Sequence, residues 1–220
     1  IFLTETAEFA DVILPASSYM EKEGTYTNTD RRVQIGRKVL ESPGEAREDW
    51  RILCDVATRI GLPMEYDSPR EIFDELCRAS SGGTADYTGA TWERIVDEPG
   101  LFWPIPEVGH PGTPRLHEGG IFSHPDGKAR FHAVPYRPPA EVVDDDYPVW
   151  LTTGRVVSQY LSGTQTRRIG PLVAQYPEPL CEMHPRLAER HDISTGDIVR
   201  VTSRRGSMTL PAKVVATIRP

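Results

Sequence analysis

The residues best suited to chemistry lie between positions 148 and 168, in a segment that contains no acidic side chain. Hydroxyl and amide groups follow one another closely there, and Arg155, Arg167 and Arg168 accompany them. Hydroxyls and amides match the hydrogen-bonding edges of a heterocycle, and guanidinium groups match phosphate oxygens. In a chain with 32 acidic and 25 basic residues, this exclusion of carboxylates indicates a site for a large phosphorylated heterocycle. A solvated polar loop has the same residue types, so composition alone leaves both interpretations open.

A short apolar run precedes these polar residues and must position them. Residues 149–151, Val-Trp-Leu, are bounded by Pro148 and Gly154, which predicts a buried strand. Gly154 has no side chain, so the backbone there can approach a bound group closely. The predicted binding surface is therefore the end of a strand and the loop that follows it.

Residues 21–34 repeat this chemistry, with hydroxyls, an amide and the adjacent arginines Arg31 and Arg32. Turn-forming glycine and asparagine residues make a solvated β-hairpin one interpretation of this stretch. A second contribution to a phosphate-bearing ligand is the other interpretation, because the residue types match those of the segment at 148–168.

Both stretches resemble motifs of the molybdopterin oxidoreductases, the bis-molybdopterin guanine dinucleotide (bis-MGD) enzymes that include nitrate reductases and formate dehydrogenases. Thr-Thr-Gly-Arg at 152–155, followed by Ser-Gly-Thr-Gln-Thr-Arg-Arg at 162–168, resembles their dinucleotide-binding segment. Residues 21–34 are similar to the segment after an "ADVVLP" strand in the third domain of that family. The resemblance covers nearly all of the chain. The sequence of residues 155–168 is most similar to that of assimilatory-type nitrate reductases, and next to that of the formate dehydrogenase catalytic subunit.

The resemblance implies a fold of two parts. Residues 1–140 would be an α/β segment from the end of domain III, with an irregular excursion and a linker. Residues 147–220 would be a mostly β, double-psi β-barrel-like domain IV that binds the dinucleotide. The pattern Gly-Asp-x-Val-x-Val at 196–201, followed by Arg-Gly at 205–206, carries the barrel resemblance. In the family the barrel runs on past the equivalent of Pro220, so we expect it to be incomplete here.

Periodicity predicts the individual elements. Apolar spacing and capping residues predict helices at 4–10, 46–60, from Ser68 through Cys77, 91–96 and 185–191. Apolar or alternating runs predict strands at 12–14, 127–132, 197–203 and 208–217. Residues 98–126, rich in Pro, Gly and His, indicate an irregular excursion, and residues 135–147 indicate an interdomain linker.

The resemblance also implies a reaction and a set of binding residues. It implies two-electron chemistry at molybdenum held by the dithiolenes of two pterin cofactors (Mo-bis-MGD), and electrons from a 4Fe–4S cluster in an earlier part of the parent chain. We expect no catalytic residue and no metal ligand in this chain. Arg167 and Arg168 serve either the cofactor or surface pairing. The residues implied to bind cofactor are Thr152, Thr153, Gly154, Arg155, Ser158, Gln159, Ser162 and Thr164, together with Asn28, Thr29 and Arg32.

Composition limits the partners. A net charge of −7 argues against nucleic acid, and no apolar run reaches the length that spans a bilayer. Three widely separated cysteines fit free thiols and lack the spacing of a zinc or iron–sulfur site. The chain begins with Ile1 and stops at Pro220, so we expect an internal fragment. We expect the parent protein to be cytoplasmic. Its expected partners are MGD, the remaining domains of the parent chain and an electron donor. The alternative of another class is a non-catalytic double-psi barrel interaction module.

Overall fold

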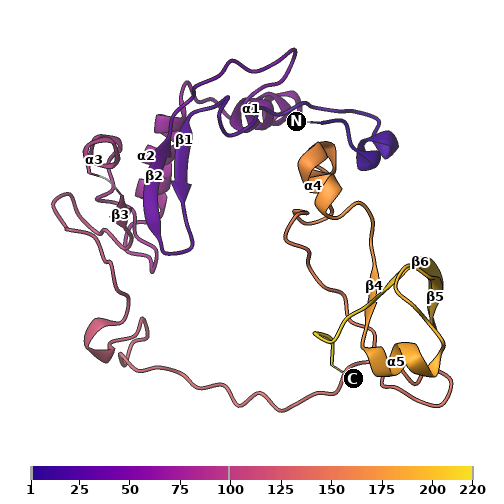
Figure 1. The fold of residues 1–220 in the computed structure, drawn as a ribbon. Coiled ribbons are helices and arrows are strands. Elements are labelled where there is room, and N and C mark those ends of the chain that lie inside the picture. Colours follow the sequence, from indigo (N-terminus) through magenta and orange to yellow (C-terminus); the bar gives the residue numbers. More distant parts are fainter. Residues whose placement is uncertain (1, 99, 220) are drawn as a thin grey trace. The chain divides into compact units, whose positions relative to one another are not determined.

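The computed structural model describes residues 2–98 and 100–219, which form two compact units (Figure 1). One unit comprises residues 3–133, and the other comprises residues 134–219 with Phe2. Each has its own cluster of buried apolar residues. The domain limits predicted from the sequence, 1–140 and 147–220, stay predictions. Over the described residues, the helices are all too short or too polar to cross a bilayer.

A hairpin forms the sheet of the first unit. β1 (Gly24–Thr27) pairs antiparallel with β2 (Arg32–Gly36), and β3 (Leu101–Phe102) adds antiparallel to β2, which gives the order β1-β2-β3. The Asn28 side chain closes the turn, because its oxygen accepts a hydrogen bond from the Arg32 backbone N–H at 3.0 Å. A β-hairpin, one of the two interpretations of residues 21–34, is therefore present, and the contribution of these residues to a ligand stays a prediction.

Capping residues determine where the helices of the first unit begin. Thr4, Ser68 and Thr91 each accept a hydrogen bond from the backbone N–H three residues later, at 3.3, 3.4 and 3.3 Å. The three predicted helices at these caps are confirmed, the first of them as a 3-10 helix, and the helix predicted at 46–60 forms over a shorter range. The bounds are η1 (Glu5–Phe9), α1 (Asp49–Arg59), α2 (Pro69–Ala79), α3 (Trp92–Asp97) and the 3-10 helix η2 (Glu118–Gly120).

Phe73 of α2 lies at the centre of the first core. The rings of Tyr87 and Trp92 meet it edge-on, each with a centroid separation of 6.3 Å. Burial raises the pKa of the neighbouring Cys77 thiol to about 11. The other buried members are Val33, Ala90, Ile95, Leu101 and Ile105.

The second unit holds a parallel and an antiparallel pairing in one sheet of order β4-β6-β5. β5 (Ile198–Ser203) and β6 (Gly206–Val214) form a hairpin, and β4 (Cys181–Met183) lies parallel to β6. Met183 and Ala212 of this sheet bury Ala188 of α5 (Pro185–Arg190), the helix that follows β4. The predicted helix at 185–191 and the two predicted strands after it are confirmed. Two further helices precede β4, namely η3 (Thr166–Arg168) and α4 (Gly170–Gln175).

Three predicted strands do not form, at 12–14, 127–132 and 149–151. The first and last are extended runs whose side chains are about half exposed or more, and Phe131 in the second is 98% exposed. In the part of the chain that the structure describes, these runs pair with no neighbouring strand. An apolar run becomes a buried strand only when another strand completes its backbone hydrogen bonds, and local sequence cannot supply that partner. The apolar stripe of α1 is likewise open, because none of its residues is buried.

Because Phe73 is 3% exposed, we expect Phe73→Ala to lower the free energy of unfolding of the first unit by about 3–5 kcal/mol. Leu76→Ala on the same helix is the matched control, since Leu76 is 44% exposed and its loss should cost less than about 1 kcal/mol. Urea unfolding followed by NMR signals of β2 measures both, and signals of β5 report the second unit. Equal losses for the two variants would contradict the packing described.

The raised pKa of the Cys77 thiol makes a prediction about reactivity. A thiol of pKa about 11 holds roughly a hundredfold less thiolate at pH 8 than one at the ordinary value of 9.0. Because the thiolate is the nucleophile, iodoacetamide should modify Cys77 at pH 8 at least about a hundredfold more slowly in the folded chain than in urea. Mass spectrometry of the alkylated peptides measures this, and equal rates would show that Cys77 is not buried.

Candidate functional site

The polar segment at 152–168 begins with four open residues. Thr152, Thr153, Gly154 and Arg155 are all exposed, and they lie in irregular backbone outside any strand. Within residues 2–98 and 100–219, neither their backbone groups nor their side chains have a hydrogen-bond or ion-pair partner. These residues therefore present backbone N–H groups, two hydroxyls and one guanidinium that a ligand could use.

The loop that follows is closed by a hydrogen-bond relay. The Thr166 hydroxyl accepts from the Tyr160 backbone N–H at 3.0 Å and donates to the side-chain oxygen of Gln159 at 2.7 Å. The side-chain nitrogen of Gln159 donates to the carbonyl of Leu172 in α4, at 3.5 Å. The two ends of the loop and the following helix are thus joined by neutral hydrogen bonds.

A tight turn at Gly163 forms the tip of this loop. Gly163 has φ 76°, and its N–H donates to the Tyr160 carbonyl at 2.9 Å. A Cβ at this position would lie 2.8 Å from Cγ of Arg167 and 3.0 Å from the side-chain oxygen of Gln159. Only glycine satisfies both the left-handed φ and this close approach.

Two hydroxyls flank the turn. Oγ of Ser162 and Oγ1 of Thr164 are 3.1 Å apart, and Ser162 is exposed while Thr164 is half-buried. The Arg168 guanidinium donates to the Thr164 carbonyl at 3.2 Å, which uses one of its nitrogens within the loop. Ser158 is half-buried. The predicted binding residues of this segment therefore lie in an open strip at 152–155 and in the closed loop that follows it.

The predicted binding residues of the first unit form a separate group. Asn28 is engaged in the hairpin turn, Thr29 is exposed, and the Arg32 guanidinium stacks on the Phe102 ring at 4.7 Å from its centroid. Arg31 differs from its neighbour, because its guanidinium donates to the carbonyls of Trp103, Thr113 and Pro114 and so holds the chain together. The adjacent arginines that the sequence presents as a pair therefore have different roles.

Sequence reasoning missed a small basic pocket beside Arg32. Its volume is about 250 Å³, and Arg32, Gln34 and Arg37 supply its polar lining, with no carboxylate. Gly100 also lines it, at φ 82°, where a Cβ would lie 2.5 Å from the Arg32 side chain. The available signal was that Arg32 and Gln34 lie two residues apart on β2, on the same face of the strand, and that Arg37 follows the strand directly.

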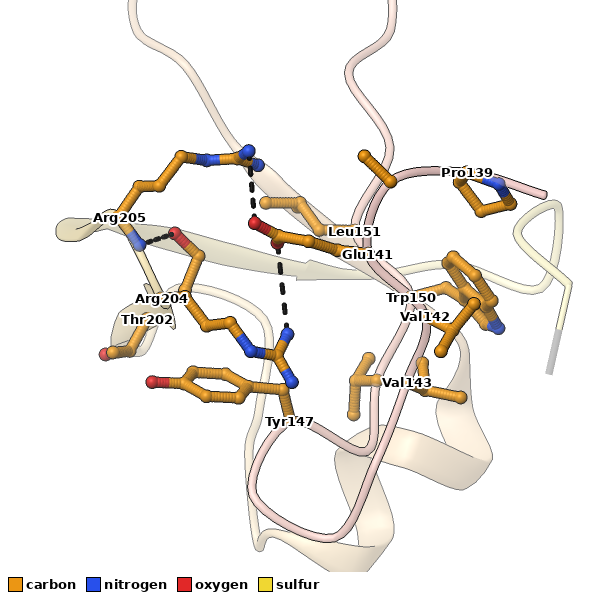
Figure 2. A pocket seen from close by; sticks show the side chains of 13 residues that line it. Pro139, Glu141, Val142, Val143, Tyr147, Trp150, Leu151, Thr202, Arg204 and Arg205 are labelled. Atoms are coloured by element: carbon orange, nitrogen blue, oxygen red, sulfur yellow. Dashed lines mark hydrogen bonds and ion pairs between the residues drawn. The ribbon is translucent and has the colours of Figure 1, made fainter. Parts of the chain in front are cut away.

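A larger pocket of about 350 Å³ in the second unit was also missed (Figure 2). Glu141 contacts Arg205 at 3.2 Å and Arg204 at 3.9 Å, and Arg204 also pairs with Asp144. Trp150 and other apolar side chains line the side away from these charges, as Figure 2 shows. The acidic run before the polar segment and the Arg-Arg turn after β5 were the signal, because opposite charges attract across a fold.

The described residues offer no ready metal site. Across positions 2–98 and 100–219, His, Cys, Asp and Glu side chains nowhere gather in threes as a metal centre would need. The site is therefore characterised by hydroxyl, amide, backbone N–H and guanidinium donors, which suit an organic phosphate ligand.

Comparison with known proteins agrees with this chemistry. The family model "Molybdopterin oxidoreductase" matches residues 1–59, and "Molydopterin dinucleotide binding domain" matches residues 149–220. The assimilatory nitrate reductase catalytic subunit of Bacillus subtilis is 46% identical over all of this chain and 31% of its own length. The F420-dependent formate dehydrogenase subunit alpha of Methanocaldococcus jannaschii is 42% identical over all of this chain and 32% of its own length. The periplasmic nitrate reductase of Desulfovibrio desulfuricans is 33% identical over 98% of this chain and 31% of its own length.

A solved structure shares the fold. Acetylene hydratase from Pelobacter acetylenicus superposes with a TM-score of 0.64 over 96% of this chain and 30% of its own, at 21% identity. This chain spans about a third of the length of the curated relatives that it matches. The predicted resemblance to this family, to nitrate reductases first and formate dehydrogenases next, is confirmed. The chain therefore belongs to the molybdopterin oxidoreductase family, and its residues 149–220 match the dinucleotide-binding domain of that family.

Proposed function

We propose that this chain is the cofactor-binding C-terminal part of a molybdenum bis-MGD oxidoreductase, and that residues 152–168 hold one MGD. The observation that carries the proposal is the open strip at 152–155, whose donors have no partner within the described residues, beside a closed loop without carboxylates. The match of residues 149–220 to a dinucleotide-binding domain supports the same ligand.

The residues present fit this cofactor. The exposed Arg155 guanidinium suits a pyrophosphate oxygen, and the hydroxyls of Ser162 and Thr164 suit the edge of a pterin or guanine ring. The backbone N–H groups of Thr152 and Thr153 can donate to further phosphate oxygens. When bound, the group supplies two-electron chemistry at molybdenum, and this chain binds and orients it.

For the first unit, we propose that Asn28, Thr29 and Arg32 contribute to cofactor binding. The pocket beside Arg32 has no carboxylate in its lining, which supports this for the arginine, and the Arg32 guanidinium also lies 3.9 Å from the Asp30 carboxylate. The Asn28 side-chain oxygen already accepts a turn hydrogen bond, so its remaining capacity is two amide N–H donors and one further lone pair. No catalytic group and no metal ligand are proposed in this chain.

We propose nitrate reduction to nitrite as the activity of the whole protein, with oxidation of formate as the alternative. The greater identity to an assimilatory nitrate reductase than to a formate dehydrogenase subunit supports this order.

The hairpin of β5 and β6 with parallel β4 supports a double-psi β-barrel as the complete fold of the second unit. A non-catalytic interaction module is the remaining alternative, and the exposed apolar side chains of Trp150 and Leu151 favour it.

We also propose a 4Fe–4S cluster in an earlier part of the parent chain, an electron-donor protein or domain as partner, and a cytoplasmic location. One relative carries a periplasmic name, so the location needs its own test. Cell fractionation with an antibody to this chain tests the location. The gene for the parent protein tests the cluster, because four cysteines at cluster spacing should precede the region matched here.

Arg155→Ala should weaken binding of MGD by about tenfold or more, because a charge-assisted hydrogen bond to phosphate is lost. The ligand is MGD released from a purified molybdoenzyme, and titration of its pterin fluorescence measures the affinity. Arg200→Ala on β5 is the matched control, since Arg200 is also exposed but lies outside the loop. Raising the salt concentration should narrow the difference between the wild type and Arg155→Ala. Equal affinities at low salt would remove Arg155 from the site.

The 220-residue chain alone should not reduce nitrate or oxidise formate with a viologen dye as electron carrier. The physical reason is that we propose the metal ligand and the iron–sulfur cluster for other parts of the parent protein. The control is a purified nitrate reductase assayed with the same dye. Turnover above the rate of the dye alone would refute this assignment.

A further inference from the structure

Gln159 was expected to contact the cofactor, yet its side-chain amide is used inside the loop. Its oxygen accepts from the Thr166 hydroxyl at 2.7 Å, an ordinary length for such a bond. Its nitrogen donates to the Leu172 carbonyl at 3.5 Å. Both ends of the amide thus join parts of the chain that lie 7 and 13 residues away.

The Thr166 hydroxyl is equally occupied. It donates its single proton to Gln159 and accepts the Tyr160 backbone N–H at 3.0 Å. A hydroxyl has one donor, so no proton remains with which it could donate to a ligand while the relay holds. These three residues form a clamp, which we define as Gln159, Tyr160 and Thr166.

The clamp encloses a stretch of backbone that contains two left-handed φ angles. Leu161 has φ 51°, a left-handed conformation that is uncommon for a side chain of this kind, and Gly163 has φ 76°. Such conformations persist where the surrounding contacts determine them. The turn at Gly163 packs against the Gln159 amide, since a Cβ there would lie 3.0 Å from its oxygen.

The same turn sets the spacing of the two hydroxyls proposed to meet the ligand. Ser162 and Thr164 flank Gly163, and their hydroxyls hydrogen-bond each other at 3.1 Å, which leaves one of their two protons for a ligand. If the clamp opened, the loop would gain conformations in which the two hydroxyls point apart. A ligand would then have to order the loop as it binds, which weakens binding without the loss of any direct contact.

We infer that Gln159 and Thr166 are positioning residues, which pre-form the Ser162–Thr164 hydroxyl pair for the cofactor without contacting it. This inference rests on the proposed function for the identity of the ligand. It reassigns Gln159 from the ligand contacts to the support beneath them. The specificity of the loop for a ring edge then comes from a hydroxyl pair held at fixed separation.

The first test needs no ligand. Amide hydrogen exchange in the 220-residue chain is measured for Thr166→Val, which keeps the shape and loses the hydroxyl, and for Thr166→Ser, which keeps the hydroxyl. We expect the Tyr160 amide to exchange about tenfold faster or more in Thr166→Val, because its acceptor is gone, and Thr166→Ser to restore slow exchange. Gln175→Leu is the matched control, since this glutamine at the end of α4 is exposed and lies outside residues 152–168. Unchanged exchange in β5 and β6 shows that the variants fold.

The second test adds MGD to the same variants. Thr166→Val and Gln159→Leu should each lower the affinity about tenfold, Thr166→Ser should rescue it, and Gln175→Leu should leave it unchanged. Ser162→Ala should lower the affinity and leave Tyr160 exchange unchanged, which is the signature of a direct contact. If Thr166→Val binds MGD poorly while its Tyr160 amide exchanges at the wild-type rate, the inference is overturned and Thr166 contacts MGD directly. Fast exchange with unchanged affinity would show that the clamp does not serve binding.

The two proposals fail differently. If the wild-type chain binds no MGD, the proposed function is contradicted, while the ligand-free exchange rates still decide whether Gln159 and Thr166 hold the loop. If the wild type binds MGD and Thr166→Val matches it in both affinity and exchange, the proposed function stands and the positioning role is wrong.

Discussion

The candidate site depends on one hydroxyl that makes two hydrogen bonds. Oγ1 of Thr166 links the backbone at Tyr160 to the amide of Gln159, and through that amide to α4. A carboxylate in this loop would compete with a phosphate ligand for the arginines. Neutral hydrogen bonds close the loop without adding negative charge. The absence of carboxylates is therefore the constraint on the rest of the candidate site.

The arginines of the chain illustrate how this constraint distributes charge. Arg204 is neutralised by Glu141 and Asp144, and Arg31 donates hydrogen bonds to three backbone carbonyls. Arg155 has no such partner in the described part of the chain and is exposed. The same side chain thus serves as an ion-pair partner, as a structural support and as an open donor. Only the last of these roles leaves a guanidinium available to a phosphate.

The family likeness and the fold likeness carry different weight. Relatives at 46% and 42% identity have names that give different substrates, and the structure that shares the fold is a hydratase. A common scaffold that binds and orients a cofactor accommodates such variety, because the cofactor carries the difficult chemistry. The features of this chain that bear on function are therefore the donors that we propose it presents to the cofactor.

The sequence by itself determined the elements whose contacts are local. The helices capped by Thr4, Ser68 and Thr91 begin as predicted, because a cap and its partner lie three residues apart. The hairpin of β5 and β6 was predictable for the same reason, and the motif at 152–168 located the candidate site. The family followed from that motif and from the similar stretch at 21–34.

Tertiary structure alone decided which apolar runs pair and which polar groups stay open. The runs at 12–14 and 149–151 have strand-like sequences, but a strand exists only where a distant segment supplies the opposite ladder of hydrogen bonds. The role of Gln159 was hidden in the same way. Whether its amide meets a ligand or Thr166 depends on the turn at Gly163, which brings residues seven apart within 2.7 Å. Residue type records that a group can form a hydrogen bond, and only the folded path of the chain selects its partner.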